Sequence, residues 1–309
     1  MVFGTFAIEV MSEMKKHVRC ISCNSDNLRS KRGYERHALV HCGSCGLHFI
    51  EQIPTQEELT AFYAKYAYSK DPWISPITIK RYHTLLDQFE PYRKTNKLLD
   101  VGCGAGHFLN VAKERGWEVH GTEYSPAAIA LCEAKGIEMK SGALNPADFD
   151  LSSFDVITSF EVLEHINNPQ EDTGSIEKLL RPGGMHYLTT PNFNALSRFW
   201  LKADYNVIGY PEHLAYYSRA SLKKLMKSFD LSTKRCVTEG ISISRIRKSK
   251  GDATFKLNSE AAPDENLRAK TETNPFWKGV KRLANTVFRV TGTGVTLKGY
   301  FLKPTKASK

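Results

Sequence analysis

The chain has 309 residues, with 43 lysines and arginines against 33 aspartates and glutamates, so its formal net charge is +10. This length suits one large domain with a small appendage, or two modest domains. No run of about 18 apolar residues occurs, so the sequence predicts no membrane-spanning helix. The positive excess belongs to residues 245–309, which hold 15 basic and 5 acidic side chains.

The first 17 residues are an N-terminal extension. It lacks a basic start, and Glu9 interrupts its short apolar stretch, so it makes a poor signal peptide. The sequence contains seven cysteines, of which Cys103, Cys132 and Cys236 have no paired spacing. Reduced thiols favour a cytoplasmic location.

Two cysteine pairs come next. "RCISCN" (residues 19–24) holds Cys20 and Cys23, "HCGSCG" (41–46) holds Cys42 and Cys45, and 18 residues separate the pairs. This spacing is typical of a four-thiolate zinc site, and a closed set of four ligands indicates a structural metal. We call residues 18–53 the four-cysteine ribbon and expect a zinc ribbon there, with disulfide pairing as the alternative.

A helical linker or lid is expected over residues 54–94. Thr55 and Glu58 have the spacing of a capping box, and the tyrosines Tyr63, Tyr66 and Tyr68 follow. They either pack as an apolar stripe or place one tyrosine at a cleft.

The most informative stretch begins at residue 97. "KLLDV" predicts a strand ending near Asp100, "GCGAG" a glycine turn, and residues 107–115 an amphipathic helix. "WEVHGTE" predicts a second strand that ends at Glu123, before a helix with Ser125 as N-cap and Pro126 at its first position. This order is a nucleotide-binding βαβ half.

The glycine turn does not match a dinucleotide-binding fingerprint. That fingerprint has the order G-x-G-x-x-G, whereas here the order is G-x-G-x-G and His107 stands at the last glycine position. Asp100 precedes the turn, where it would oppose a pyrophosphate but suit a ligand with an ammonium group. With these motifs, residues 97–247 resemble the class I S-adenosylmethionine-dependent methyltransferases.

The resemblance implies an α/β fold with a seven-stranded Rossmann-like sheet behind an N-terminal zinc ribbon. It implies S-adenosylmethionine as cofactor, with the glycine turn against the methionine and ribose, Asp100 at the amino group, Glu123 at the ribose hydroxyls and Tyr124 beside the adenine. The cofactor-binding residues expected in this way are Asp100, Gly102, Cys103, Gly104, Gly106, Glu123, Tyr124, Ala143, Leu144, Phe160 and Glu161.

The segment after the fifth expected strand is rich in aromatic residues. Its piece "PEHLAYYSRASLKKLM" resembles a segment of methyltransferases that act on sugars and other small molecules, in which a Glu-His pair is the general base. Glu212 and His213 match that pair, and a histidine suits proton removal near neutral pH. A histidine hydrogen-bonded within the loop is the alternative. For His165, after "FEVLE", a structural role at a helix start is favoured.

The end of the chain predicts a sixth strand in "STKRCVTEGISISRI" and a seventh in "GTGVTLKGYFLKP", with an insertion between them. The core would then span residues 95–247, the insertion 248–290, and the final strand with a basic tail 291–309. The insertion starts with a polar stretch and continues with an amphipathic helix, "PFWKGVKRLANTVFRV". That helix either covers the core or lies on an anionic membrane at the inner face.

We therefore expect methyl transfer to a small-molecule acceptor, most simply a sugar or glycan precursor of cell-surface polysaccharide synthesis. A first alternative is an RNA methyltransferase, because zinc modules and basic tails also occur in nucleic-acid-binding proteins. No motif for methylating bases appears, so nucleic acid is not the expected partner. A second alternative is a non-enzymatic zinc-ribbon binding protein, which the intact glycine turn with Glu123 disfavours. The methylated atom and the oligomeric state are left open.

Overall fold

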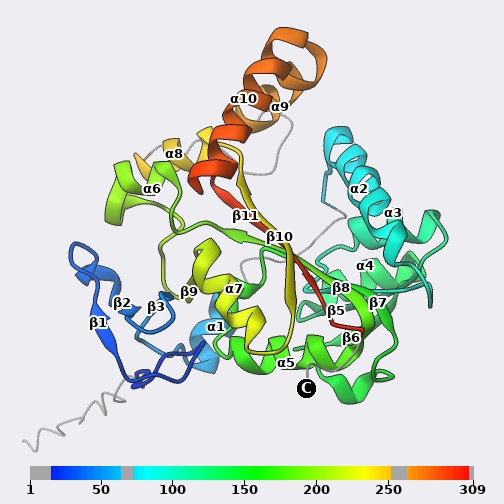
Figure 1. Ribbon diagram of the computed structural model, residues 1–309, viewed down its shortest axis with the longest axis horizontal. Helices are drawn as coiled ribbons and strands as arrows, with labels where there is room; N and C mark the ends of the chain where they lie inside the picture. Colours follow the sequence, from blue (N-terminus) through cyan, green and yellow to red (C-terminus); the bar gives the residue numbers. More distant parts are fainter. Residues whose placement is uncertain (1–14, 64–71, 252–262, 306–309) are drawn as a thin grey trace, which may run out of the picture.

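The computed structural model describes residues 15–63, 72–251 and 263–305 (Figure 1). Its main sheet has seven strands in the order β10-β11-β8-β7-β4-β5-β6. These strands are β4 (Lys97–Val101), β5 (Glu118–Glu123), β6 (Glu138–Ser141), β7 (Phe154–Phe160), β8 (Leu180–Pro191), β10 (Ser232–Glu239) and β11 (Thr296–Leu302).

The main sheet is mixed. The pairs from β6 through β8 are parallel, whereas β11 pairs antiparallel with both β8 and β10. β4 lies between β5 and β7, so the strand order reverses there. Ligands of such sheets bind at the carboxyl ends of the strands beside this reversal. The expected seven-stranded Rossmann-like fold is confirmed.

Helices cover both faces of the sheet because the central strands are apolar on both sides. In β4, Leu98 packs with α2 and α3, whereas Leu99 packs in a second cluster with α5 and α7. This alternation follows from the two-residue period of a strand. The α-helices are α1 (Gln56–Tyr63), α2 (Pro76–Phe89), α3 (His107–Glu114), α4 (Pro126–Ala134), α5 (Pro169–Leu179), α6 (Leu196–Leu201), α7 (Arg219–Lys227), α8 (Ile243–Ser249), α9 (Pro263–Thr273) and α10 (Pro275–Thr291).

The four-cysteine ribbon forms a second sheet that the core completes. Its strands pair in the order β1-β2-β3-β9, and all neighbours are antiparallel. The first three strands belong to the ribbon, whereas β9 follows β8 in the core. Their bounds are β1 (Leu28–Ser30), β2 (Leu39–Cys42), β3 (His48–Ile50) and β9 (Ala215–Tyr216).

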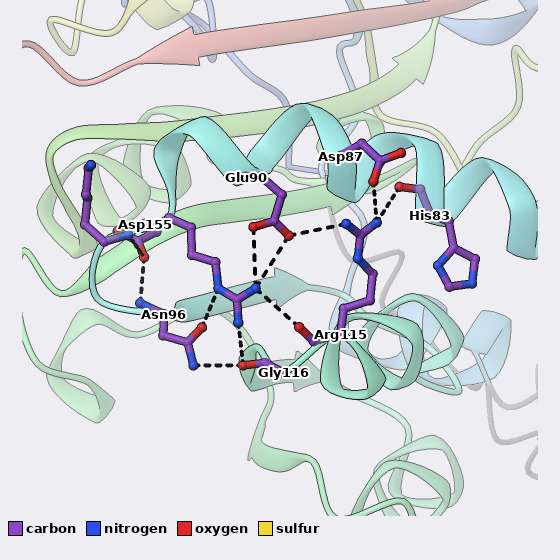
Figure 2. Close-up of polar contacts among 9 residues, drawn as sticks. His83, Asp87, Glu90, Asn96, Arg115, Gly116 and Asp155 are labelled. Atoms are coloured by element: carbon purple, nitrogen blue, oxygen red, sulfur yellow. Dashed lines mark hydrogen bonds and ion pairs between the residues drawn. The ribbon is translucent and has the colours of Figure 1, made fainter.

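The carboxyl end of α2 is fixed at the amino edge of the main sheet. Figure 2 shows that Arg115, after α3, contacts Asp87 and the backbone oxygen of His83, both on α2. Glu90 lies between Arg115 and Arg93, and each ion pair measures about 3.5 Å. α2 therefore runs from this fixed end toward the carboxyl edge, where the site lies.

Several local expectations are confirmed. Thr55 and Glu58 form the capping box, Ser125 caps α4, and the final strand returns to the sheet. Tyr66 and Tyr68 lie outside the described residues, and so does the side chain of Tyr63, so the expectation about these tyrosines stays a prediction. In the part of the chain that the structure describes, no helix combines the length and apolar character needed to cross a membrane.

Other expectations are wrong in detail. Residues 163–165 form a short 3-10 turn, because Asn168 caps the true helix α5 four residues later than expected. The predicted sixth strand ends at Glu239, and α8 takes up the rest of that stretch. The boundary drawn between residues 247 and 248 therefore cuts α8. The polar part of the insertion includes a helix, α9, which an ion pair from Glu272 to Lys281 joins to α10.

Candidate active site

The glycine turn after β4 needs glycine at each of its three positions. Gly102, Gly104 and Gly106 have φ angles of +65°, +55° and +72°, in the left-handed region that other residues rarely adopt. A Cβ on Gly102 would also lie 2.8 Å from a methyl carbon of Val162. The turn thus brings bare backbone to the carboxyl edge of the sheet, where a ligand can approach closely.

Glu123 is held in place by backbone amides. Its Oε2 accepts a hydrogen bond from the Gly104 N–H at 3.0 Å, and its Oε1 accepts from the N–H groups of Tyr124 and Ser125 at 2.8 and 3.0 Å. The carboxylate therefore links the glycine turn to the start of α4. It retains lone pairs that could accept the two hydroxyls of a ribose.

Asp100 lies beneath the turn, 2% exposed. Burial raises its pKa to about 8, against a hydrogen bond from the Thr158 hydroxyl at 2.6 Å that lowers it. A bound ammonium group would favour the charged carboxylate. This is the electrostatic setting that the expected contact with the methionine amino group requires.

The other expected cofactor residues surround the turn at different depths. Tyr124 and Ala143 are exposed, Cys103 and Phe160 are half-buried, and Leu144 is buried. Phe160 packs edge-on against Phe108 and contacts Tyr82 of α2, with ring centres 5.0 and 6.2 Å apart. Sequence reasoning did not name Tyr82. It expected a tyrosine at the cleft from earlier in the linker, among Tyr63, Tyr66 and Tyr68.

A second cluster joins His213 to the turn after β7. The His213 and His165 rings lie 4.8 Å apart, and their ring nitrogens lie within 4.8 Å of a Glu164 carboxylate oxygen. The Nδ1–H of His213 donates to the Val207 carbonyl at 2.6 Å, and that of His165 donates to the Glu212 carbonyl at 2.5 Å. Each neutral ring therefore presents its Nε2 lone pair.

Burial sets the charge of this cluster. It lowers the pKa of His213 to about 3 and lowers the pKa of His165, so both rings are neutral at pH 7. It also raises the pKa of Glu164 well above its ordinary value. Among the described residues, Glu164 Oε1 makes no hydrogen bond. Two imidazole lone pairs and a carboxylate oxygen could accept an acceptor's hydroxyl proton or hold a divalent cation.

Glu161 directly follows the last residue of β7 and precedes Glu164 by three positions. It has a φ of +55°, which is strained for a glutamate, and Arg245 of α8 lies 3.6 Å from its carboxylate. The backbone oxygen of Glu212 accepts the hydrogen bond from His165, and the role expected for the Glu212 side chain stays a prediction.

Sequence reasoning missed Glu164 and Arg245 and favoured a structural role for His165 at a helix start. The signal was the acidic pair with a histidine in "EVLEH", directly after a buried parallel strand. The carboxyl ends of neighbouring parallel strands lie at the same edge of a sheet. Because β7 and β8 are such neighbours, the residues after β7 are expected near the residues after β8.

The four cysteines of the ribbon converge as expected. Sγ of Cys20 lies 3.5 Å from Sγ of Cys45, Sγ of Cys23 lies 3.6 Å from Sγ of Cys42, and all four atoms lie within 4.8 Å of one another. A tetrahedral zinc with bonds of about 2.3 Å needs sulfur atoms about 3.8 Å apart, so the set fits zinc. Burial raises the pKa of Cys23 to about 11, so without a cation this thiol is protonated at neutral pH.

The ribbon also holds the segment that carries His213. β3 pairs with β9, so Phe49 faces Ala215, and the Ile50 N–H donates to the Leu214 carbonyl at 2.8 Å. On its other side, the Leu214 N–H donates to the Glu164 carbonyl at 2.7 Å. The residue after His213 is thus fixed between the ribbon and the turn that bears Glu164 and His165.

Comparisons with known proteins agree with this geometry. A family described as a methyltransferase domain matches residues 77–234. A ubiquinone biosynthesis O-methyltransferase of Idiomarina loihiensis is 36% identical over 112 residues, which is 34% of this chain and 45% of that protein. The chain thus spans less than half the length of this curated relative.

Two solved structures share the fold. A SAM-dependent methyltransferase from Archaeoglobus fulgidus has a TM-score of 0.51 at 15% identity, and the match covers 79% of this chain and 99% of that one. A putative sarcosine dimethylglycine methyltransferase from Galdieria sulphuraria has a TM-score of 0.52 at 15% identity, with 81% and 100% covered. With the family match over half of its length, the chain belongs to the methyltransferase-domain family, as a class I S-adenosylmethionine-dependent member.

Proposed function

We propose that the chain transfers the methyl group of S-adenosylmethionine to a hydroxyl oxygen of a small-molecule acceptor. The observation that carries this proposal is the pair of neutral histidines beside Glu164, on a turn whose Val162 packs against Gly102 of the glycine turn. The bound cofactor would supply an electrophilic methyl group on a sulfonium. The residues of the chain have to hold the acceptor in line with that methyl group and take up its proton.

The step balances without a further reactant. The hydroxyl oxygen forms a bond to the methyl carbon while the carbon–sulfur bond breaks, which leaves S-adenosylhomocysteine. The hydroxyl proton goes to the Nε2 lone pair of His213. Since His213 Nδ1–H donates to the Val207 carbonyl, the protonated ring would be stabilised in the orientation that it already has.

The low pKa of His213 bears on the kind of hydroxyl. A weak base removes a proton more readily from a phenol, with a pKa near 10, than from a less acidic sugar hydroxyl. This consideration favours a phenolic acceptor, and the relatives named for ubiquinone biosynthesis support an O-methyl acceptor. The sugar or glycan precursor expected from the sequence is the alternative acceptor for the same site.

The test uses purified, zinc-loaded protein and methyl-labelled S-adenosylmethionine. Acceptors are offered as separate sets: dihydroxyphenols with and without a prenyl chain, nucleotide sugars, lipid-linked sugars and RNA. His213→Gln keeps a polar side chain but removes the base, so the rate should fall about 10²- to 10⁴-fold while S-adenosylmethionine affinity is unchanged. His83→Gln, on the exposed side of α2, is the matched control and should retain full activity.

The outcomes separate the parts of the proposal. Label in a phenol, lost in His213→Gln and kept in His83→Gln, would support it. Label in a sugar would change the acceptor from a phenol to a sugar and leave the proposed role of the site in place. Label in RNA, or equal rates in His213→Gln and the unchanged protein, would overturn it.

A further inference from the structure

α10 exposes an apolar stripe along its whole length. Phe276, Leu283 and Val290 are 69%, 70% and 75% exposed, and Val280 and Val287 are also exposed. These five residues are spaced by four and three positions in turn, so they lie on one side of the helix. Figure 1 shows α10 extending away from the main sheet together with α9.

The stripe is not the side by which α10 contacts the core. Phe288, which is 8% exposed, is the buried residue of the helix, and its backbone oxygen accepts a hydrogen bond from Thr238 of β10. Asn285 accepts one from the Gly240 N–H. Both residues are offset from the stripe around the helix, so the contacts with β10 leave the five apolar side chains uncovered.

The basic side chains of α10 lie on the sides of the helix away from the stripe, because Lys278 and Arg282 each follow a stripe residue by two positions. α10 contains four basic residues and α8 three, and neither helix contains an acidic one. Lys278 and Arg282 are exposed and make no ion pair with a described residue. Phe276 and Trp277, with rings 5.5 Å apart, stand at the amino end of α10, where aromatic side chains could anchor in a lipid interface.

A second exposed apolar group adjoins the carboxyl end of α10. Leu196, Phe199, Trp200 and Ile241 are each at least half exposed. They border a hollow of about 520 Å³ whose lining also includes Ile246 of α8 and Thr293, two residues beyond α10. The Leu196 N–H donates to the Thr293 carbonyl. The stripe and this group are therefore neighbours at one end of the molecule.

We propose that α10, with the apolar group on α6 and Ile241, is a docking face for an anionic membrane surface. Apolar side chains would enter the boundary between headgroups and acyl chains, and Lys278 and Arg282, on the sides of the helix turned away from the stripe, would attract the anionic surface without inserting into it. A second copy of the chain fits less well. Pairing α10 with its own copy would bring together two helices that each carry four basic residues and no acidic one, and like charges near an interface oppose association.

The test measures binding to vesicles, without cofactor or acceptor. The protein should float with phosphatidylcholine vesicles that contain phosphatidylglycerol, at least tenfold more than with phosphatidylcholine alone, and less at high salt. The double variant Phe276→Ser with Leu283→Ser should lose this binding. Lys278→Gln with Arg282→Gln should lose the preference for phosphatidylglycerol. Leu151→Ser, also at an exposed leucine (63%) but before the amino end of β7, is the matched control and should bind normally.

Circular dichroism and thermal unfolding check that each variant folds. Absence of vesicle binding by the unchanged protein would overturn the proposal, and so would equal loss in Leu151→Ser. A dimer in solution that Phe276→Ser with Leu283→Ser disrupts, without any vesicle binding, would assign the face to a second copy instead. Because no methyl transfer is measured, the result does not depend on the proposed function.

Discussion

The four-cysteine ribbon and the helical hairpin of α9 and α10 are both attached to the same core, but in opposite ways. The ribbon shares the large hydrophobic cluster of the core, in which its Leu47 and Phe49 are 0% exposed. It also extends a sheet into β9. α10 buries mainly Phe288 and keeps its apolar stripe exposed.

The difference indicates what each appendage does. A module fixed by strand pairing and buried side chains can hold another segment in place, and the segment that the ribbon holds carries His213. We therefore expect the ribbon to position the candidate site. A helix attached by one buried residue and a few polar contacts cannot position the site, but its uncovered side is available to another surface.

Removing one of the four clustered cysteines should have the largest effect. Cys42→Ser should abolish stable metal binding and lower methyl transfer at least tenfold, because the pairing of β3 with β9 would loosen and release the His213 segment. Metal content and the rate of transfer are the measurements. Cys236→Ser, at a buried cysteine of β10 outside the cluster, should keep both. Full activity in a metal-free Cys42→Ser protein would break the link between ribbon and site.

Replacing a phenylalanine by alanine in each of the two appendages should give the next largest difference, in the free energy of unfolding. Phe49→Ala removes a fully buried ring and should lower the free energy of unfolding by about 3 to 5 kcal/mol. Phe276→Ala removes a ring that is 69% exposed and should change it by less than about 0.5 kcal/mol. Urea unfolding followed by circular dichroism measures both. Similar losses in the two variants would mean that α10 packs against something in the free protein.

The attachment of α10 should show a smaller, pH-dependent effect. Burial alone would raise the pKa of Glu239, but ion pairs with Lys298 and Arg289 outweigh it and lower that pKa from 4.5 to about 2. The resulting stabilisation, about 2 kcal/mol after allowing for the exposed Arg289, is present above pH 4.5 and is lost as pH falls toward 2.

Glu239→Gln tests this attachment. It should lower stability at pH 7 and flatten the dependence of the unfolding free energy between pH 5 and 2.5, measured by urea unfolding at each pH. Glu114→Gln, at an exposed acid of α3, is the control. An unchanged pH dependence in Glu239→Gln would show that these ion pairs do not hold α10.

Local pattern in the sequence predicted the elements that depend on near neighbours. The glycine turn with Asp100 and Glu123, the capping residues and the two cysteine pairs each rest on spacing within a short segment. The elements predicted wrongly, α8 and the turn at residues 163–165, are short, and their type depends on what they pack against. Arg245 of α8, for example, faces Glu161, which is 84 residues away in the chain.

The sequence by itself therefore determined the fold family, the glycine turn with Asp100 and Glu123, and the four-thiol cluster. Only the tertiary structure decided that the ribbon supports the His213 segment, that His165 and Glu164 join His213, and that the apolar side of α10 faces outward. These arrangements join residues 47 to 168 positions apart. Pairing over such distances is set by how the sheet orders its strands, and no local spacing in the sequence records it.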